Sequence, residues 1–283
     1  MKQTKKNKIC YNCEVSSDTK KSSVKKKLAP WKVEMGLKTH FPNDIIMPLK
    51  VNIPKKYDSN YELKLGKKNA NKYVYYYCAN KKETSDCLTS FSSKDVYGDG
   101  FSNRGVVKCD NEGIANIKFM CPQAYYVNDK DTLHLPHLHY FISDKENKKW
   151  NEKLYTERII CDLNKKQLTD IINNQCALVF NALPFHEYMK GRIPKSLPVP
   201  YDIMTNDKVT KSQFMEYVRD MLVHYPKINK KVVDKKLKIE NIPIVVYCYN
   251  DKCEASSILI EKLIEMGFID IKEYSEGITG WEK

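Results

Sequence analysis

The sequence predicts a two-domain protein, in which an all-β antiparallel sandwich is followed by an α/β domain with a parallel sheet. Residues 28–163 consist of short alternating or aromatic runs between Asn-, Asp-, Gly- and Lys-rich turns, with no convincing helix. Strands at this spacing are typical of a sandwich. From about residue 162 onward, strand-like runs alternate with helical patterns, which predicts parallel strands. We place the two domains at residues 33–163 and 164–283, and a chain of 283 residues is long enough for two cores.

A basic tail precedes the two domains. Residues 1–32 carry ten lysines against Glu14 and Asp18, so this segment holds +8 of the chain's formal charge of +13. It is rich in Ser and Thr and lacks hydrophobic periodicity, as flexible segments do. We expect it either to bind nucleic acid or an acidic partner through salt-sensitive contacts, or to act only as a solubilising arm. Its single Cys10-x2-Cys13 pair is half of a zinc site.

The composition predicts a soluble chain in the cytoplasm. No apolar run reaches the length of about 18 residues that a membrane-spanning helix needs, and the N-terminal residues are polar rather than signal-like. We therefore expect no membrane span and no secretion, and we expect the ten cysteines to be reduced thiols. The abundance of Lys, Asn, Ile and Tyr would suit an AT-rich genome, and packaging in a viral particle is consistent with that origin.

Seven runs in the first domain have the composition of strands. Turn signals lie between them, such as Gly-Asp-Gly at residues 98–100 and Asp-Asn-Glu-Gly at residues 110–113. The expected strands span residues 44–51, 61–65, 73–79, 106–109, 115–120, 138–143 and 158–162.

Two segments of this domain resemble the intradiol ring-cleavage dioxygenases. These are residues 105–125, GVVKCDNEGIANIKFMCPQAY, and residues 135–141, LPHLHYF, within a likeness that extends over about residues 70–163. The resemblance implies a sandwich whose non-haem ferric ion is held by two Tyr and two His. Tyr125, His137 and His139 stand at the positions of the second Tyr and of the His pair. The first Tyr has no clear counterpart; Tyr97 and Tyr126 are candidates, and neither aligns.

The residue types agree with a metal site at this place. On a strand, His137 and His139 point to the same face, so both imidazoles can reach one ion. Imidazole suits iron, copper or zinc, and a phenolate from Tyr125 would favour a ferric ion. We expect a transition metal here, non-haem iron first, with ring cleavage as one function. The alternative is a sandwich in which the His pair is polar packing.

The second domain reads as strands alternating with helices. Helical patterns cover residues 165–174 and 211–224, strand-like runs cover residues 178–181 and 244–248, and residues 227–238 form a polar, basic loop. A final helix follows residue 248 after a short polar loop. Ser256 or Ser257 is expected to cap its N-terminus and Gly267 to end it.

These elements carry a resemblance to the rhodanese (sulfurtransferase) domains. A strand, a Cys loop and a helix, then Gly-Phe, an acidic-aromatic strand and Gly277-Ile278-x-x-Trp281, look like the C-terminal half of that domain. Residues 177–200 are similar to its first strand and its Gly-His-Ile-Pro signature, which reads Gly-Arg-Ile-Pro at residues 191–194 here. Asn181 stands where the family has an acidic residue, and the Cys loop is one residue longer.

Three interpretations of the Cys loop remain open. As a sulfurtransferase, Cys248 attacks a small sulfur donor and carries a persulfide, with Lys252 as counter-charge. As a thiol-redox site, Cys248 and Cys253 cycle between dithiol and disulfide with a thiol protein. In the third, the loop is inactive and both are ordinary cysteines. A different class of function, a structural or interaction protein of a virion or nucleoprotein assembly with degenerate sites, also remains open.

Overall fold

The computed structural model describes residues 50–97, 102–127, 132–151, 153–206 and 209–282. Two compact units are present, one made of residues up to Glu83 with Ser90–Ile159, the other of Thr84–Thr89 with Ile160–Lys283. The basic tail at residues 1–32, with its Cys pair, lies outside the described residues. No helix among the described residues is long and apolar enough to cross a membrane.

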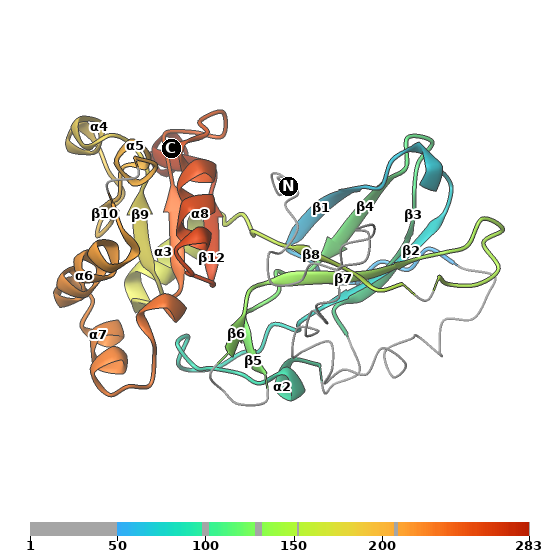
Figure 1. The fold of residues 1–283 in the computed structure, drawn as a ribbon, viewed down its shortest axis with the longest axis horizontal. Coiled ribbons are helices and arrows are strands. Elements are labelled where there is room, and N and C mark those ends of the chain that lie inside the picture. Colours follow the sequence, from blue (N-terminus) through green and yellow to red (C-terminus); the bar gives the residue numbers. More distant parts are fainter. Residues whose placement is uncertain (1–49, 98–101, 128–131, 152, 207–208, 283) are drawn as a thin grey trace, which may run out of the picture. The chain divides into compact units, whose positions relative to one another are not determined.

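The first unit contains antiparallel strands, as the alternating runs predicted (Figure 1). One sheet has the order β3-β2-β7-β8, and two further pairs are β1 with β4 and β5 with β6. The elements are β1 Ser59–Lys64, β2 Tyr73–Cys78, α2 Ser93–Tyr97, β3 Arg104–Lys108, β4 Ile114–Phe119, β5 Tyr125–Val127, β6 Thr132–His134, β7 His137–Ile142 and β8 Tyr155–Arg158.

The sequence located the long strands of this unit and missed its short elements. β5 and β6 have three residues each and α2 has five, too few for a periodicity to be visible. The strand expected at residues 158–162 is wrong in position, because β8 ends at Arg158. That these sheets stack as a dioxygenase-like sandwich remains a prediction.

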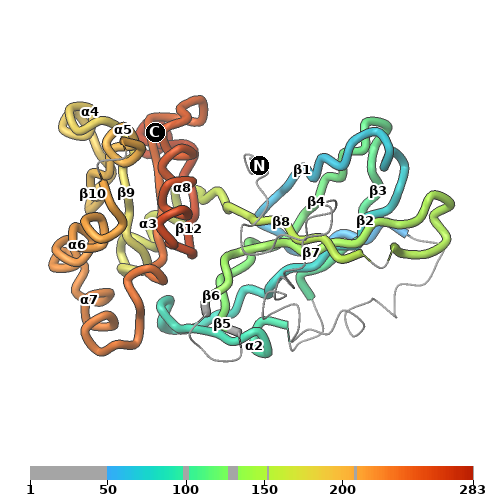
Figure 2. The backbone as a smooth tube through the Cα atoms, viewed as in Figure 1, coloured from blue at the N-terminus to red at the C-terminus, as the bar shows by residue number. Residues whose placement is uncertain are grey.

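The second unit is an α/β domain with the parallel sheet that the sequence predicted. The strand order is β10-β9-β11-β12, and each strand runs parallel to its neighbours. Figure 2 traces the alternation of helix and strand along the chain. The elements are α3 Lys165–Asn174, β9 Leu178–Asn181, α4 Phe185–Lys190, β10 Leu197–Pro198, α5 Tyr201–Met204, α6 Lys211–Met221, α7 Pro226–Val233, β11 Ile244–Tyr247, α8 Ala255–Glu265, β12 Ile271–Tyr274 and α9 Gly277–Glu282.

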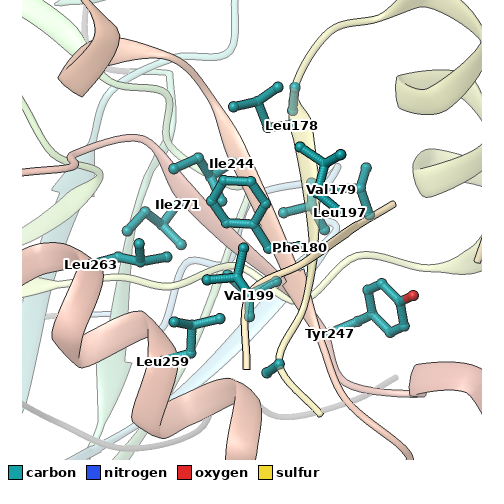
Figure 3. Close-up of a cluster of buried hydrophobic side chains, with 14 of the residues drawn as sticks. Leu178, Val179, Phe180, Leu197, Val199, Ile244, Tyr247, Leu259, Leu263 and Ile271 are labelled. Atoms are coloured by element: carbon teal, nitrogen blue, oxygen red, sulfur yellow. The ribbon is translucent and has the colours of Figure 1, made fainter. Parts of the chain in front are cut away.

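β11 lies between β9 and β12, and its four residues are fully buried. An all-apolar run is what a strand covered on both sides requires. Figure 3 shows Ile244 with Leu259 and Leu263 of α8 and Ile271 of β12 in the core of this unit. Asn164 caps α3 through a reciprocal capping box with Gln167, which explains why this helix begins where the sequence predicted.

Two expectations for the second unit are wrong. Residues 227–238 are not a loop throughout, since α7 begins at Pro226 and buries Ile228. Proline fits the first turn of a helix, where its missing N–H is not needed. The ten cysteines are not all reduced, because Cys87 and Cys176 form a disulfide.

Candidate functional site

Cys248 directly follows β11, at the carboxyl end of the parallel sheet. Its side chain is fully buried, and a short loop leads from it to the N-terminus of α8. Parallel α/β sheets form their binding sites at this end of the strands. The fold therefore places Cys248 where the sequence predicted a reactive thiol.

The groups around the Cys248 sulfur favour a protonated thiol. Sγ lies 3.5 Å from the carbonyl oxygen of Asn250 and 3.4 Å from that of Cys253, and both oxygens can only accept a hydrogen bond. The Ser256 hydroxyl lies 3.3 Å from Sγ. It donates to Glu273 Oε1 at 2.6 Å, so its oxygen lone pair is available to accept the S–H. The backbone N–H of Ser256 also bonds to this sulfur, so the loop combines an amide donor with two carbonyl oxygens.

The pKa of the Cys248 thiol is raised to about 12. Burial is the largest cause, because it removes water from the thiolate. The hydrogen bond with Ser256 acts in the opposite direction, and the contact with the Cys253 side chain raises the pKa further. The Cys248 sulfur lies 3.4 Å from the Cys253 carbonyl oxygen, so the two residues of the predicted redox pair are close in the loop.

The other residues predicted for this loop lie nearer to solvent. Cys253 is half-buried, and its N–H donates to the Asn250 carbonyl at 3.1 Å. Lys252 is exposed, and its N–H donates to the Asn250 side chain at 3.0 Å. The predicted serine caps are wrong: α8 begins at Ala255, and Ser256 lies buried in its first turn, directed at Cys248.

The start of α9 holds the backbone of the Cys loop. The N–H of Ile278 donates to the Cys248 carbonyl and that of Thr279 to the Tyr249 carbonyl, both at 3.1 Å. Gly277 has φ +60°, and a Cβ there would lie 2.4 Å from the Cys248 carbonyl oxygen. Only glycine fits this position, which gives the Gly277 motif a physical role.

Tyr247, the residue before Cys248, is held by a network of buried hydrogen bonds. Its hydroxyl points away from the apolar cluster in Figure 3 and accepts hydrogen bonds from Asn181 Nδ2 at 2.9 Å and the Ile193 N–H at 3.0 Å. Ser196 Oγ lies 2.8 Å from the same hydroxyl. Asn181, in place of an acidic residue, therefore supplies a neutral donor to a buried network.

The family model of the rhodanese-like domain matches residues 164–283. These residues form a rhodanese-like domain. Within this domain, Arg192 is the residue that differs from the Gly-His-Ile-Pro signature. Its side chain is exposed, and its guanidinium packs over the Tyr188 ring, 5.0 Å from the ring centre. Sequence reasoning missed the contact of Ser256 with Glu273, because β12 reads Ile-Lys-Glu-Tyr and its composition does not show which charged residue is buried.

Solved structures with a similar fold include a human single-domain sulfurtransferase, with 12% identity and a TM-score of 0.31 over 43% of this chain and 94% of that one. A rhodanese-related protein from Thermoplasma volcanium has 17% identity and a TM-score of 0.28, over 43% of this chain and 90% of that one. A protein from Bacillus halodurans has 18% identity and a TM-score of 0.29, over 43% and 71%. No curated protein matched the chain.

The first unit brings the predicted metal residues together. His137 Nε2 lies 3.0 Å from His139 Nε2 and 3.1 Å from the Tyr125 hydroxyl, and all three side chains are buried. The family match lies outside this unit, so its likeness to dioxygenases remains a prediction. Among the described residues, no group of three or more His, Cys, Asp or Glu side chains is arranged for a metal ion, so any ligand set here depends on tyrosine.

Hydrogen-bond partners hold both imidazoles, and for His137 they place the proton. His137 Nδ1 lies 2.6 Å from the Leu135 carbonyl, so this nitrogen carries the proton and Nε2 offers a lone pair. Burial lowers the pKa of His137 to about 4, which keeps its imidazole neutral at neutral pH. His139 Nδ1 lies 2.9 Å from Thr156 Oγ1. Second contacts of this kind orient metal-binding histidines.

Two further tyrosines line this cluster. Tyr77, opposite His139 in the β2–β7 pairing, has its ring centre 5.0 Å from that of His139. Tyr97 packs edge-on against Tyr125 at 5.5 Å. Burial raises the pKa values of Tyr77 and Tyr97 well above the usual range. Sequence reasoning missed Tyr77, although the Tyr-rich alternation of β2 puts Tyr75 and Tyr77 on one face.

Proposed function

We propose that the rhodanese-like domain reduces sulfane sulfur with a pair of thiols. Cys248 is the nucleophile and Cys253 the thiol that resolves its persulfide. The observation that carries the proposal is the closeness of the two cysteines at the carboxyl end of β11, where Cys248 Sγ lies 3.4 Å from the Cys253 carbonyl oxygen. The family of the domain, whose chemistry is sulfur transfer, is consistent with this assignment.

The reaction has two steps. In the first, the Cys248 thiolate attacks the outer sulfur of a donor such as thiosulfate or a small persulfide, forms an S–S bond, and expels the rest of the donor. In the second, Cys253 attacks the inner sulfur of the Cys248 persulfide and releases hydrosulfide. The pair is then a disulfide: two thiols have been oxidised by two electrons and one sulfane sulfur has been reduced. A dithiol reductant or thiol protein restores the pair.

The surroundings of Cys248 favour the second step over storage of a persulfide. A stored persulfide is anionic and is stabilised by N–H donors; besides the Ser256 N–H, Sγ here faces the carbonyl oxygens of Asn250 and Cys253. Ser256 and Glu273 offer a path for the proton, because the hydroxyl that accepts the S–H also donates to the carboxylate. A persulfide formed here is therefore short-lived while Cys253 is present.

The test is the intact mass of the reduced protein after brief treatment with a sulfane donor. We expect the wild type to lose the mass of two hydrogens, Cys253→Ser to gain one sulfur atom, and Cys248→Ser to stay unchanged. A sulfur atom retained by the wild type would favour a plain sulfurtransferase. No change in any of the three proteins would favour a structural or interaction role for the domain.

We also propose that the first unit binds a transition-metal ion through Tyr125, His137 and His139. His137 Nε2 lies 3.0 Å from His139 Nε2 and 3.1 Å from the Tyr125 hydroxyl, the separation of ligands that share one ion with bonds of about 2 Å. This donor set suits ferric iron. When bound, such an ion would supply Lewis-acid or oxygen chemistry, as in the ring-cleavage dioxygenases that this segment resembles.

Metal analysis of the purified full-length chain tests the second proposal. We expect close to one first-row transition ion per chain in the wild type, lost in both His137→Ala and His139→Ala. His186→Ala is the matched control, because His186 is an exposed side chain of α4. Equal metal content in all four proteins would contradict the proposal, and so would a metal-free wild type that binds none on addition of ferrous or ferric iron.

A further inference from the structure

A second sulfur centre lies at the disulfide between Cys87 and Cys176. Cys87 belongs to Thr84–Thr89, a short segment that clusters with the second unit while the residues on either side belong to the first. Cys176 lies two residues before the first residue of β9, at the amino end of the parallel sheet. Cys248 follows the carboxyl end of β11, so the two sulfur centres are at opposite ends of the sheet.

Three contacts hold this segment to the second unit. One is the disulfide. The second is Leu88, which is 7% exposed and belongs to the core of the α/β domain. The third is Asp86, whose carboxylate lies 2.6 Å from Lys231 Nζ and 3.5 Å from Lys227 Nζ, both on α7. These ion pairs lower the pKa of Asp86, the hydrogen bond with Lys231 being the largest cause.

Positively charged side chains lie beside the Cys87 sulfur of the disulfide. The Lys227 ammonium lies 3.4 Å from Cys87 Sγ and 3.3 Å from the Asn174 carbonyl. Lys231 is engaged with the carboxylate of Asp86, so two cations face one anion beside Cys87. A cation next to a sulfur stabilises the thiolate that this sulfur becomes when the S–S bond breaks. A more stable thiolate is a faster leaving group.

We infer that the Cys87–Cys176 disulfide is a site of exchange with small thiols. Cys87 is exposed and Cys176 is half-buried, so both sulfur atoms are within reach of a small nucleophile. The thiolate of a small monothiol attacks Cys176 Sγ, and a mixed disulfide forms there. The Cys87–Cys176 bond breaks, and its electron pair leaves with Cys87 as a thiolate paired with Lys227. A second thiol then reduces the mixed disulfide, which completes a two-electron reduction.

Opening the disulfide removes the covalent link and leaves non-covalent contacts to hold the segment: Leu88, the Asp86 ion pairs and the pairing of Cys87 with Lys227. Those ion pairs are partly exposed, and such pairs contribute little to stability in water. The exchange site therefore controls how firmly Thr84–Thr89 is attached to the α/β domain. This role is independent of the chemistry at Cys248.

The experiment uses the oxidised full-length chain, after accessible free thiols have been blocked by alkylation. The protein is treated with glutathione, quenched with acid, alkylated with a second reagent and mapped by peptide mass. We expect glutathione on Cys176 and the second reagent on Cys87. Lys227→Gln should slow the exchange roughly three- to tenfold, because the departing thiolate loses its cation.

Lys230→Gln is the matched control, because Lys230 lies on the same helix and pairs with Asp234. This variant should exchange at the wild-type rate. Three results would overturn the inference: glutathione on Cys87 with Cys176 released, equal rates for Lys227→Gln and Lys230→Gln, or no exchange at all. Hydrogen exchange of Thr84–Thr89, faster after reduction, would measure its release directly.

Discussion

The two candidate sites are built in different ways. In the α/β domain, backbone groups surround the reactive atom: loop carbonyls face Cys248, and the N–H groups of Ile278 and Thr279 hold its loop. In the first unit, side chains rather than backbone groups form the site. His137 and His139 alternate along β7, Tyr77 lies opposite His139 on the neighbouring strand β2, and Tyr125 comes from the separate β5–β6 pair.

This difference predicts how each site responds to mutation. A loop site depends on backbone conformation, so a single methyl group in the wrong place can displace it without any change in chemistry. A site on the face of a sheet depends on side chains, and the strands persist when one of them is changed. Three variants and one pH dependence exploit this contrast, from the largest expected effect to the smallest.

Gly277→Ala should have the largest effect. The new Cβ would overlap the carbonyl oxygen of Cys248, and its φ of +60° is unfavourable for alanine. We expect a loss of roughly 3 kcal/mol in the free energy of unfolding of the α/β domain and loss of the Cys248 reaction, measured by urea denaturation and donor treatment. Gly191→Ala is the control, because its Cβ would meet nothing closer than 3.8 Å. Equal effects of the two variants would contradict the role of Gly277.

Tyr125→Phe should weaken metal binding in the first unit and leave the Cys248 reaction intact. Loss of the phenol oxygen removes one of three proposed ligands, so we expect the dissociation constant for ferric iron to rise about a hundredfold, measured by competition with a chelator. Tyr126→Phe is the control, because neighbouring residues on a strand point to opposite faces. A smaller effect at Tyr125 than at Tyr126 would show that the sheet face does not form the site.

Tyr247→Phe should destabilise the α/β domain by about 2 kcal/mol, because Asn181 Nδ2 and the Ile193 N–H lose a shared acceptor in a buried place. Chemical denaturation measures the effect. Tyr217→Phe removes only one hydrogen bond, to the partly buried Pro198 carbonyl, and should cost less. If both variants lower the free energy of unfolding equally, the hydrogen-bond network of Tyr247 contributes no more to stability than a single hydrogen bond.

The smallest expected effect is the pH dependence of the rate at which Cys248 is alkylated. Because its pKa is raised to about 12, the thiolate fraction should rise about tenfold per pH unit and should not level off near the usual thiol pKa. Alkylation of Cys248 in a Cys253→Ser background measures this, and Ser256→Ala should slow it further, since the Ser256 hydrogen bond lowers the pKa. A plateau near pH 9 would show that the thiol is less buried than described.

The sequence predicted elements with a strong pattern and missed contacts that depend on the tertiary structure. Periodicity located α3 and β9 residue by residue, because a capping box and an apolar run mark their ends. The position of Cys248 followed from the strand and helix around it. The direction of the loop carbonyls could not be predicted, because the composition of a polar loop does not determine how its backbone is oriented.

The first unit shows the same limit. Alternation predicted that His137 and His139 share a face, and Tyr125 was added by a family resemblance. The contribution of Tyr77 depends on the pairing of β2 with β7, a contact between residues far apart in the chain. Likewise, the ten cysteines gave no hint that Cys87 would meet Cys176, because a disulfide is fixed by distance in space.

Single-turnover release of hydrosulfide tests the central claim most directly. The reduced wild-type chain is mixed with less than one equivalent of a persulfide donor, without any external thiol, and hydrosulfide is measured over time. The account predicts one hydrosulfide per donor consumed, with formation of a Cys248–Cys253 disulfide and no release from Cys253→Ser. Sulfur held on Cys248 in the wild type, with Cys253 still a free thiol, would contradict it.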